Sequence, residues 1–474
     1  MGLVLTIARA EWRLIVRRRS YFALLTLFAA LLTTAAVLSG QRQGRERTQQ
    51  AGYQALVRAQ WEGQPERHPH RVAHYGTFAF KPPGPLAVID PGVDSYGGRV
   101  LYLEAHRQNA ANFAEAGELS SAFRLGELSL AFLLHLVLPL IVVVLGHRLF
   151  VDEAEIGRLR LLLAQGASAR TLGFGKLAGL TLALLPFLAL GAIACGATLV
   201  RDAAFLSAPD GVGRALAISG ALGLHLAAWL GLTIWVSSRA ASAAAACATL
   251  VTCWILTAIV APRAAAIAAG AVHPLPDKSS FAAAVAEDVR QHGDSHNPND
   301  PHFARLQQET LARYGVARVE DLPVNYGAVV MARGEEISAE IFARHFAQLA
   351  AKMEAQGSVI GRVALLAPPL AVRTLSAAAA GTDLRAQLQF QREAEAYRYR
   401  FVQQLNELHR DKVRYANDRD QKIGAEHWRQ FADFRAIPPT LRESLTGTAP
   451  AWLALLLWAV LPLVALARTK GRVT

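Results

Sequence analysis

The chain has 474 residues, of which 53% are apolar and only 18% are charged, whereas soluble domains carry roughly 25% charged residues. Together with a mean hydropathy of +0.23, this composition argues against an ordinary set of soluble domains and indicates a membrane protein. The net charge of +12 is spread over several segments, and the three cysteines (Cys195, Cys247 and Cys253) lie in apolar stretches. Nucleic-acid binding, a disulfide framework and a CxxC zinc site are therefore not predicted.

Residues 1–20 are predicted to form an amphipathic helix at the membrane surface. Apolar residues recur at helical spacing beside a basic stripe: the apolar positions are Val4, Ala8, Trp12 and Ile15, and the basic ones are Arg9, Arg13 and Arg17. Tryptophan and arginine favour the lipid headgroup region, so we expect Trp12, Arg13 and Arg17 at the membrane interface. The alternative is an ordinary positively charged flank of the first span.

Six stretches meet or approach the roughly 20 apolar residues that a helix needs to cross a bilayer. They are residues 21–39, 128–145, 177–200, 215–237, 240–262 and 449–467. A cleaved signal peptide is an alternative for the first stretch, but its apolar core is longer than the roughly 7–15 residues of a signal sequence. Six uncleaved spans are the preferred interpretation.

The orientation of these spans is predicted from Lys and Arg in short flanking segments, which are retained in the cytoplasm. Such residues precede the first span, lie between the second and third, and follow the sixth in the tail 468–474. We therefore expect both termini in the cytoplasm. Residues 40–127 and 263–448 then form a first extracytoplasmic loop and a large extracytoplasmic insert.

The cytoplasmic segment 146–176 is predicted to form a short amphipathic helix followed by a turn, here called the elbow. Acidic residues near the helix start complement the helix dipole, and a glycine followed by a serine suits a helix stop and the cap of the next helix. These residues are Glu153, Glu155, Gly166 and Ser168. Further on, Gly175 and Gly179 form a small-xxx-small pair that favours close helix packing.

The elbow resembles the loop by which the permease subunits of type-2 ABC transporters contact their ATPase. The matching residues are Glu153, Glu155, Gly157, Leu161, Leu162, Leu163, Gly166, Ser168, Arg170, Gly175 and Lys176. The sequence departs from the family pattern at Arg158-Leu159, where Thr-Leu is common, and in its looser acidic start. Two further stretches resemble a subgroup with a large insert between the fifth and sixth spans, namely 272–276 and 367–383.

The spans and this resemblance together predict an all-α polytopic membrane protein with six transmembrane helices and a mainly helical extracytoplasmic domain. The resemblance implies a location in the bacterial cytoplasmic (inner) membrane. It implies an export permease that contacts a separate ABC ATP-binding subunit through Glu153, Glu155, Gly157, Leu161, Leu162, Gly166, Ser168 and Arg170. A second permease chain, identical or a sister, and the lipid bilayer are further expected partners, and an envelope protein is another. The chain itself is expected to hold no cofactor, whereas ATP and Mg²⁺ belong to the ATPase subunit.

The insert is predicted to be helical because its apolar residues repeat at intervals of three and four. After the N-cap Thr382-Asp383, a long helix is expected over 383–423, with an apolar stripe at Ala394, Tyr397, Phe401, Leu405 and Leu408. Residues 340–354, 99–123 and 301–314 have similar patterns. We expect one mainly helical domain assembled from both extracytoplasmic loops.

Eleven of the fourteen histidines lie in the predicted extracytoplasmic loops, for example His68, His70 and His74. No fixed ligand geometry follows from their spacing, so solvated loop histidines are expected and no metal site is predicted. His135 and His225 lie within predicted spans, where a polar side chain faces the bundle interior or a cavity. They are candidate translocation-path residues, with an interhelical hydrogen bond as the alternative.

No catalytic motif is present: the sequence has no phosphate-binding loop of the type GxxxxGK[ST], no HExxH and no GxSxG. The chain is therefore not expected to be an enzyme. Three functions remain open, namely an ABC export permease, an ABC subunit that transmits ATPase motion to envelope partners without transport, and a membrane sensor without an ATPase. A midline cavity lined by His135 and His225 would favour transport, and a sealed apolar midline would favour transmission.

Overall fold

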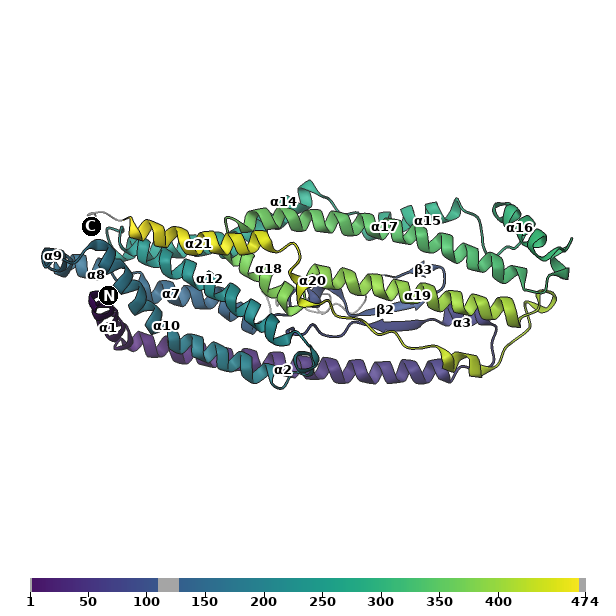
Figure 1. Cartoon of the computed structure of the whole chain (residues 1–474), viewed down its shortest axis with the longest axis horizontal. Coiled ribbons are helices and arrows are strands. Elements are labelled where there is room, and N and C mark those ends of the chain that lie inside the picture. The colour runs from purple at the N-terminus through teal and green to yellow at the C-terminus, as the bar shows by residue number, and fades with distance from the viewer. Residues whose placement is uncertain (1, 110–127, 469–474) are drawn as a thin grey trace.

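The computed structural model describes residues 2–109 and 128–468. The molecule is elongated, with the apolar helices and the elbow toward one end and a domain formed by the two long loops at the other (Figure 1). We call residues 63–109 and 273–448 the distal domain. The predicted tail residues Lys470 and Arg472 lie outside the described residues.

The first half of the chain holds the following elements: α1 (Gly2–Val16), α2 (Arg19–Glu62), α3 (Pro69–Tyr75), β1 (Thr77–Phe80), α4 (Asp94–Gly97), β2 (Val100–Glu104), β3 (Arg107–Gln108), α6 (Leu130–Phe132), η2 (Leu133–Val137), α7 (Leu138–Gly146), α8 (Val151–Glu155), α9 (Arg158–Ala164), α10 (Ala169–Leu199), α11 (Ala203–Ser207) and α12 (Gly211–Ser237).

The second half holds α13 (Ala243–Ile255), η3 (Leu256–Val260), α14 (Ala261–Val272), α15 (Lys278–Arg290), η4 (Pro301–Phe303), α16 (Ala304–Tyr314), η5 (Val319–Asp321), α17 (Tyr326–Ala364), α18 (Pro368–Ala380), α19 (Leu384–Lys412), η6 (Tyr415–Asn417), η7 (Ala425–Gln430), α20 (Leu441–Leu445) and α21 (Ala449–Ala467).

Among the described residues, six helices are long and apolar enough to cross a membrane: Arg19–Glu62, Leu130–Glu155, Ala169–Leu199, Gly211–Ser237, Ala243–Val272 and Ala449–Ala467. Each contains or overlaps one of the six predicted spans. The predicted class of an all-α polytopic membrane protein is thereby confirmed, since strands make up only a small part of the described chain.

The first membrane helix continues far beyond its apolar stretch. α2 has 44 residues and is therefore about 66 Å long, roughly twice the thickness of the bilayer hydrocarbon core. Its outer end packs into the distal domain through Trp61, whose ring lies 5.0 Å from that of Phe401 and 5.7 Å from that of Phe431. The Trp61 indole N–H donates to the Trp428 carbonyl at 2.7 Å. One helix thus joins the membrane region to the distal core.

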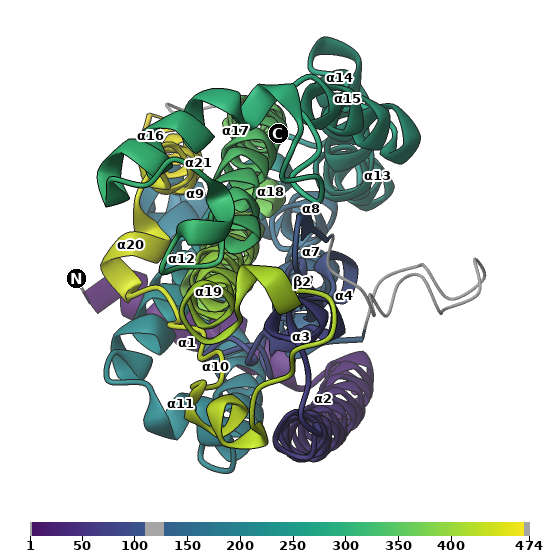
Figure 2. The ribbon, with the colours of Figure 1, turned by 90° about the vertical axis from the view of Figure 1, so that its right-hand side faces the viewer.

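Both long loops contribute to the distal domain. Val72 and Ala73 from the first loop share a core with Phe401, Val402 and Leu405 from α19. When the molecule is viewed from its distal end, α19 lies near the centre, close to α3 and β2 of the first loop (Figure 2). The apolar stripe predicted along α19 therefore forms the contact between the two loops.

The first loop also contains a small antiparallel sheet that the sequence analysis missed. β1 pairs with β2, with Thr77 opposite Leu103, and β2 pairs with β3. The helix predicted over 99–123 is therefore wrong for residues 100–108, and residues 110–127 lie outside the described residues. Alternate β2 residues are buried, Leu101 and Leu103, and they pack on α19. A five-residue strand is too short for its period of two to stand out in the sequence.

The other helices predicted in the insert are present, and two of the three have different bounds. The Asp383 side chain accepts a hydrogen bond from the Ala386 amide and caps α19. This helix ends at Lys412 and not at 423, and the chain then bends and enters η6. Residues 301–314 form η4 and α16, and residues 340–354 belong to the longer α17.

Helix α18 departs from the simple division into spans and insert. Its residues Leu370, Val372 and Leu375 are buried against Ala221 of α12 and Leu455 of α21. The buried Arg214 of α12 donates to the Ala379 carbonyl at 3.0 Å and to the Pro439 carbonyl. The insert therefore returns to the membrane helices through α18.

Replacing Trp61 by Ala should destabilise the distal domain, because the indole fills a closed aromatic core and satisfies a buried carbonyl. The expected loss is about 3–5 kcal/mol, measured as the thermal unfolding of the purified chain and its susceptibility to protease. Tyr53→Ala is the matched control, since Tyr53 lies on the same helix and is 57% exposed. Equal unfolding of both variants would contradict the docking of α2 on the distal core.

Candidate functional site

The elbow is built from two short helices and not from the single helix that was predicted. α8 ends at Glu155, and Gly157 adopts a positive φ of 75° before α9 begins. Glu155 therefore lies at the end of α8 and does not complement the dipole at the start of α9, which corrects the sequence interpretation. The break occurs because glycine enters the left-handed region at no steric cost.

The second half of the elbow has the predicted local structure. Gly166 adopts a φ of 90° after α9, and the Ser168 hydroxyl accepts a hydrogen bond from the Thr171 amide at 3.0 Å. Ser168 is thus the N-cap of α10. Two left-handed glycines and one cap fix the path of the chain around α9.

A buried ion-pair cluster joins the elbow to the membrane helices. The Lys176 ammonium of α10 lies 2.8 Å from the Glu153 carboxylate of α8 and pairs with the Glu11 carboxylate of α1. Lys176 is fully buried, and both carboxylates are nearly so. Glu153, predicted as an ATPase contact, is therefore turned inward, because its charge is needed to neutralise Lys176.

The predicted small-xxx-small pair is the place where α1 packs on α10. A side chain at Gly175 would meet Ile7, and one at Gly179 would meet the Glu11 side chain and the Ala8 carbonyl within 3.0 Å. Only glycine allows α1 to approach α10 so closely, and this approach brings Glu11 to Lys176. The prediction of close helix packing is confirmed.

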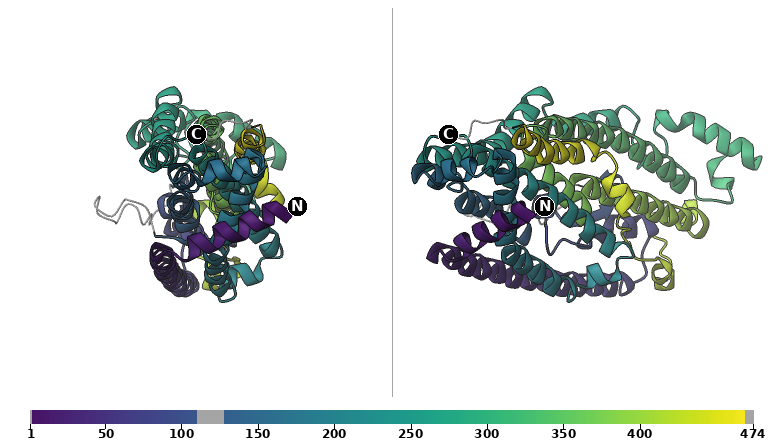
Figure 3. Two further views of the ribbon diagram at one scale, coloured as in Figure 1. Left: turned by 90° about the vertical axis from the view of Figure 1, so that its left-hand side faces the viewer. Right: turned by 60° about the vertical axis from the view of Figure 1, so that its left-hand side comes forward.

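Helix α1 lies across the end of the membrane-helix bundle, as the view of that end shows (Figure 3). Ala8 and Ile15 of its predicted apolar stripe are buried, whereas Trp12, Arg13 and Arg17 are exposed. The helix thus packs against α10 on one side, and Trp12 and Arg13 are exposed on its other sides, whereas Arg17 is exposed just after its end. Their contact with lipid remains a prediction.

The outer face of the elbow carries exposed apolar side chains. Ile156 is 65% exposed and Leu161 is 63% exposed, and the charged Glu155 and Arg170 are exposed nearby, whereas Leu162 is half-buried. Leu159 points inward and is 2% exposed. The apolar residues of the elbow therefore divide into the buried Leu159, which anchors α9, and an exposed outer face.

The two intramembrane histidines lie in the packing between helices. His225 of α12 donates from Nε2 to the His135 carbonyl at 3.0 Å, and Trp254 of α13 donates to the Leu136 carbonyl at 3.1 Å. Both carbonyls belong to the π-helical turn η2, whose widened backbone leaves carbonyls for outside donors. This arrangement matches the alternative of an interhelical hydrogen bond for His225.

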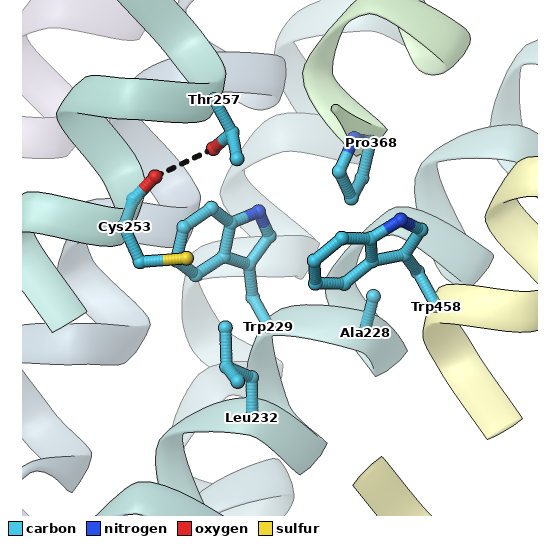
Figure 4. Close-up of a pocket in the computed structure, with 7 residues that line it drawn as sticks. All are labelled: Ala228, Trp229, Leu232, Cys253, Thr257, Pro368 and Trp458. Atoms are coloured by element: carbon cyan, nitrogen blue, oxygen red, sulfur yellow. Dashed lines mark hydrogen bonds between the residues drawn. The ribbon is translucent and has the colours of Figure 1, made fainter. Parts of the chain in front are cut away.

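A small pocket lies between α12, α13, α18 and α21 (Figure 4). It is lined by Ala228, Trp229, Leu232, Cys253, Thr257, Pro368 and Trp458. The Thr257 hydroxyl turns back to donate to the Cys253 carbonyl at 2.8 Å, so the lining is largely apolar. Neither predicted path histidine is among these lining residues.

Four distal histidines converge, which the sequence analysis did not predict. The rings of His70, His74, His106 and His296 have centroids 4.6–6.1 Å apart, and one ring nitrogen of each lies within 4.8 Å of the others. Solvated loop histidines were expected, and His74 and His296 are indeed exposed, but the convergence of the four rings was not predicted. Only the pair four residues apart on α3 was visible in the sequence, because His106 and His296 come from distant segments.

Buried charges hold this histidine cluster in place. The Glu335 carboxylate of α17 accepts from the His106 amide at 2.8 Å, lies 3.1 Å from His106 Nδ1, and pairs with Arg398 at 2.6 Å. Although burial opposes ionisation, the hydrogen bond from His106 and the charge of Arg398 hold the pKa of Glu335 below its usual value. Burial and the adjacent His74 lower the pKa of His70 to about 2, so His70 is neutral.

A second group, formed by His68, His409 and Asp418, lies in the same domain. The Asp418 carboxylate accepts from Asn325 at 2.6 Å and lies 2.6 Å from His409 Nε2, and the His68 ring accepts from the His70 amide to cap α3. These bonds give the group a structural role. His292, four residues before His296, instead lies against its own helix at the Asp288 carbonyl.

Comparison with known proteins identifies one family model. Residues 280–437 match a family described as a domain of unknown function, DUF3526. The match covers α15 to η7 and hence much of the distal domain, but less than half of the chain. No curated protein matches the chain.

Replacing Lys176 by Met should detach α1 and the elbow from α10, because it leaves the Glu11 and Glu153 carboxylates buried without a cation. Loss of one partner from a buried pair costs about 3–5 kcal/mol, measured as the thermal unfolding of the purified protein and as proteolysis of α1. The triple variant Glu11→Gln, Lys176→Met, Glu153→Gln removes all three charges and should recover most of the loss. A triple variant no more stable than Lys176→Met would contradict the electrostatic explanation.

Proposed function

We propose that the chain is the transmembrane permease subunit of an ATP-driven ABC exporter in the bacterial cytoplasmic membrane. The elbow, which contains α8 and α9, binds a separate ATPase subunit. The end of the molecule that carries the elbow therefore lies in the cytoplasm, as do both termini. The distal domain is extracytoplasmic.

The observation that carries this proposal is the form of the elbow. It is a short, defined structure with Ile156 and Leu161 exposed on its outer face, and it is tied to α10 and α1 through Glu153 and Lys176. A partner that moves the elbow must also move these helices. This is the property expected of a coupling element, and it agrees with the sequence resemblance to type-2 ABC permeases.

The proposal assigns ATP and Mg²⁺ to the partner subunit. It includes a second permease chain, identical or a sister, with which this chain forms the substrate path between two bundles. His135 and His225 stay candidate path residues in such an assembly, although His225 donates to a backbone carbonyl. Leu162, Gly157, Gly166 and Ser168 shape the contact surface, and Glu155, Leu161 and Arg170 contribute exposed side chains to it.

Replacing Ile156 and Leu161 together by Ser should weaken ATPase binding, because each buried aliphatic side chain contributes about 1.5–3 kcal/mol at an interface. Both side chains are exposed in the chain alone, so membrane insertion and thermal stability should be unchanged. The measurement is the ATP hydrolysis that co-purifies with the tagged chain from its native membranes. We expect at least a tenfold loss.

The matched control is Ile437→Ser, an exposed isoleucine of the distal domain (71% exposed), which should retain full ATP hydrolysis. Unchanged co-purification in the elbow variant would overturn the coupling assignment. Absence of ATP hydrolysis from the wild-type eluate would instead favour the membrane sensor.

A second function, transmission of ATPase motion to envelope partners without transport, is favoured by α2. Near the elbow end, the Tyr21 hydroxyl of α2 donates to the Ala183 carbonyl of α10 at 2.8 Å, and at the other end Trp61 lies in the distal core. A continuous helix between these contacts can carry a displacement over its whole length. The largely apolar pocket among the membrane helices agrees with this alternative too.

Replacing Gln49, Gln50 and Ala51 by Gly should interrupt this transmission, since each glycine weakens the helix by up to about 1 kcal/mol and adds flexibility. The readout is a fluorophore on a cysteine at the exposed Tyr314, followed on addition of ATP to the purified complex. In a transmission subunit the ATP-dependent signal should be lost while ATP hydrolysis continues.

The control replaces Gln49 and Gln50 by Ala, which preserves the helix, and should retain the signal. A signal of equal size in the glycine variant would exclude α2 as the transmitting element. It would leave the export permease as the better assignment.

A further inference from the structure

The four-histidine cluster brings together three segments that are far apart in the sequence. His70 and His74 lie one turn apart on α3, His106 occupies the turn between β2 and β3, and His296 lies in the loop before η4. In Figure 1, α3, β3 and α17 lie in the same part of the distal domain. Only His296 belongs to the segment that matches the family model.

Helix α17 positions two of the four rings. Gly334 leaves room for Ser295, since a side chain at that glycine would collide with the Ser295 side chain at 2.2 Å, and this close approach places His296 at the cluster. The next residue, Glu335, holds both the amide and Nδ1 of His106. His106 itself has a positive φ of 60°, an uncommon conformation for a residue with a side chain.

The ring nitrogens are arranged as metal ligands require. Because Nδ1 of His106 faces Glu335, the other ring nitrogen of His106, Nε2, is left for the cluster. This Nε2 atom is buried without a hydrogen-bond partner among the described residues. A carboxylate behind a histidine is the usual device that fixes the ligating tautomer. Asp294 lies 3.1 Å from Nδ1 of His296 and can serve it in the same way.

The spacing of the nitrogens suits a small tetrahedral ion. The Nε2 atoms of His70 and His74 are 3.2 Å apart, close to the roughly 3.3 Å edge of a tetrahedron with metal–nitrogen bonds of about 2.0–2.1 Å. The four ligand nitrogens all lie within 4.8 Å of one another. The longer of these nitrogen–nitrogen distances would have to shorten by about 1.5 Å at most to form such a tetrahedron. His74 and His296 are exposed, so the ion can enter from solvent and their side chains have room to adjust around it.

We propose that His70, His74, His106 and His296 form a binding site for a divalent transition-metal ion, and that this ion is Zn²⁺. Four imidazoles and no thiolate suit ions of this class, whereas Mg²⁺ and Ca²⁺ prefer oxygen ligands. The bound ion joins α3 and the β2–β3 turn to the loop that contains His296. It therefore clasps the first loop to the insert.

The test uses the tag-free full chain in detergent and Zn²⁺ alone, with affinity measured by competition against a chromophoric chelator. Wild type should bind one Zn²⁺ per chain, and its unfolding temperature should rise with Zn²⁺ but not with Mg²⁺. His74→Ala and His296→Ala change exposed side chains and should fold normally. Each should weaken Zn²⁺ binding by about tenfold or more.

His292→Ala and His302→Ala remove exposed histidines outside the cluster and should bind Zn²⁺ as wild type does. The proposal is overturned if wild type binds no Zn²⁺, or if the His74 and His296 variants bind it as tightly as these controls. It is independent of the ATPase assignment, because binding is measured on the isolated chain.

Discussion

The arrangement of the membrane end depends on one buried lysine. Lys176 lies within α10 with no exposed surface, and Glu11 and Glu153 supply carboxylates to it from two other elements. Burial of a charge is costly unless it is paired, so this requirement fixes α1 and α8 against α10. The glycines at 175 and 179 serve the same contact by allowing α1 to come close. Helix α1, the elbow and α10 therefore form one unit, and α2 extends from it to the distal domain.

Much of the fold could be predicted because it follows from local patterns. Six apolar stretches, the Asp383 cap and the apolar stripe of α19 are each visible within a short window, and each corresponds to an element of the structure. Other features depend on tertiary contacts between distant residues, which a short sequence window does not contain. α2 continues to Glu62 because Trp61 is buried in the distal core, and residues 100–104 form a strand because they pair with 77–80 and pack on α19.

The candidate sites divide in the same way. The turn at Gly166 and the cap at Ser168 are encoded in adjacent residues and could be predicted. The inward orientation of Glu153 could not, because its partner Lys176 lies 23 residues away along a chain that turns twice. The histidine cluster was missed for a similar reason. His106 and His296 are brought together by Glu335 and Gly334, and residues so distant carry no common spacing.

The position of α18 has a consequence for the order in which the molecule assembles. Leu370, Val372 and Leu375 are buried against α12, which precedes the insert in the chain, and against α21, which follows it. This core cannot close until α21 has left the ribosome and entered the membrane. The segment 280–437 is thus not an autonomous folding unit, since cutting the chain at its edges would expose the apolar face of α18 to water. The packing of α18 within the insert therefore depends on α21 being in place.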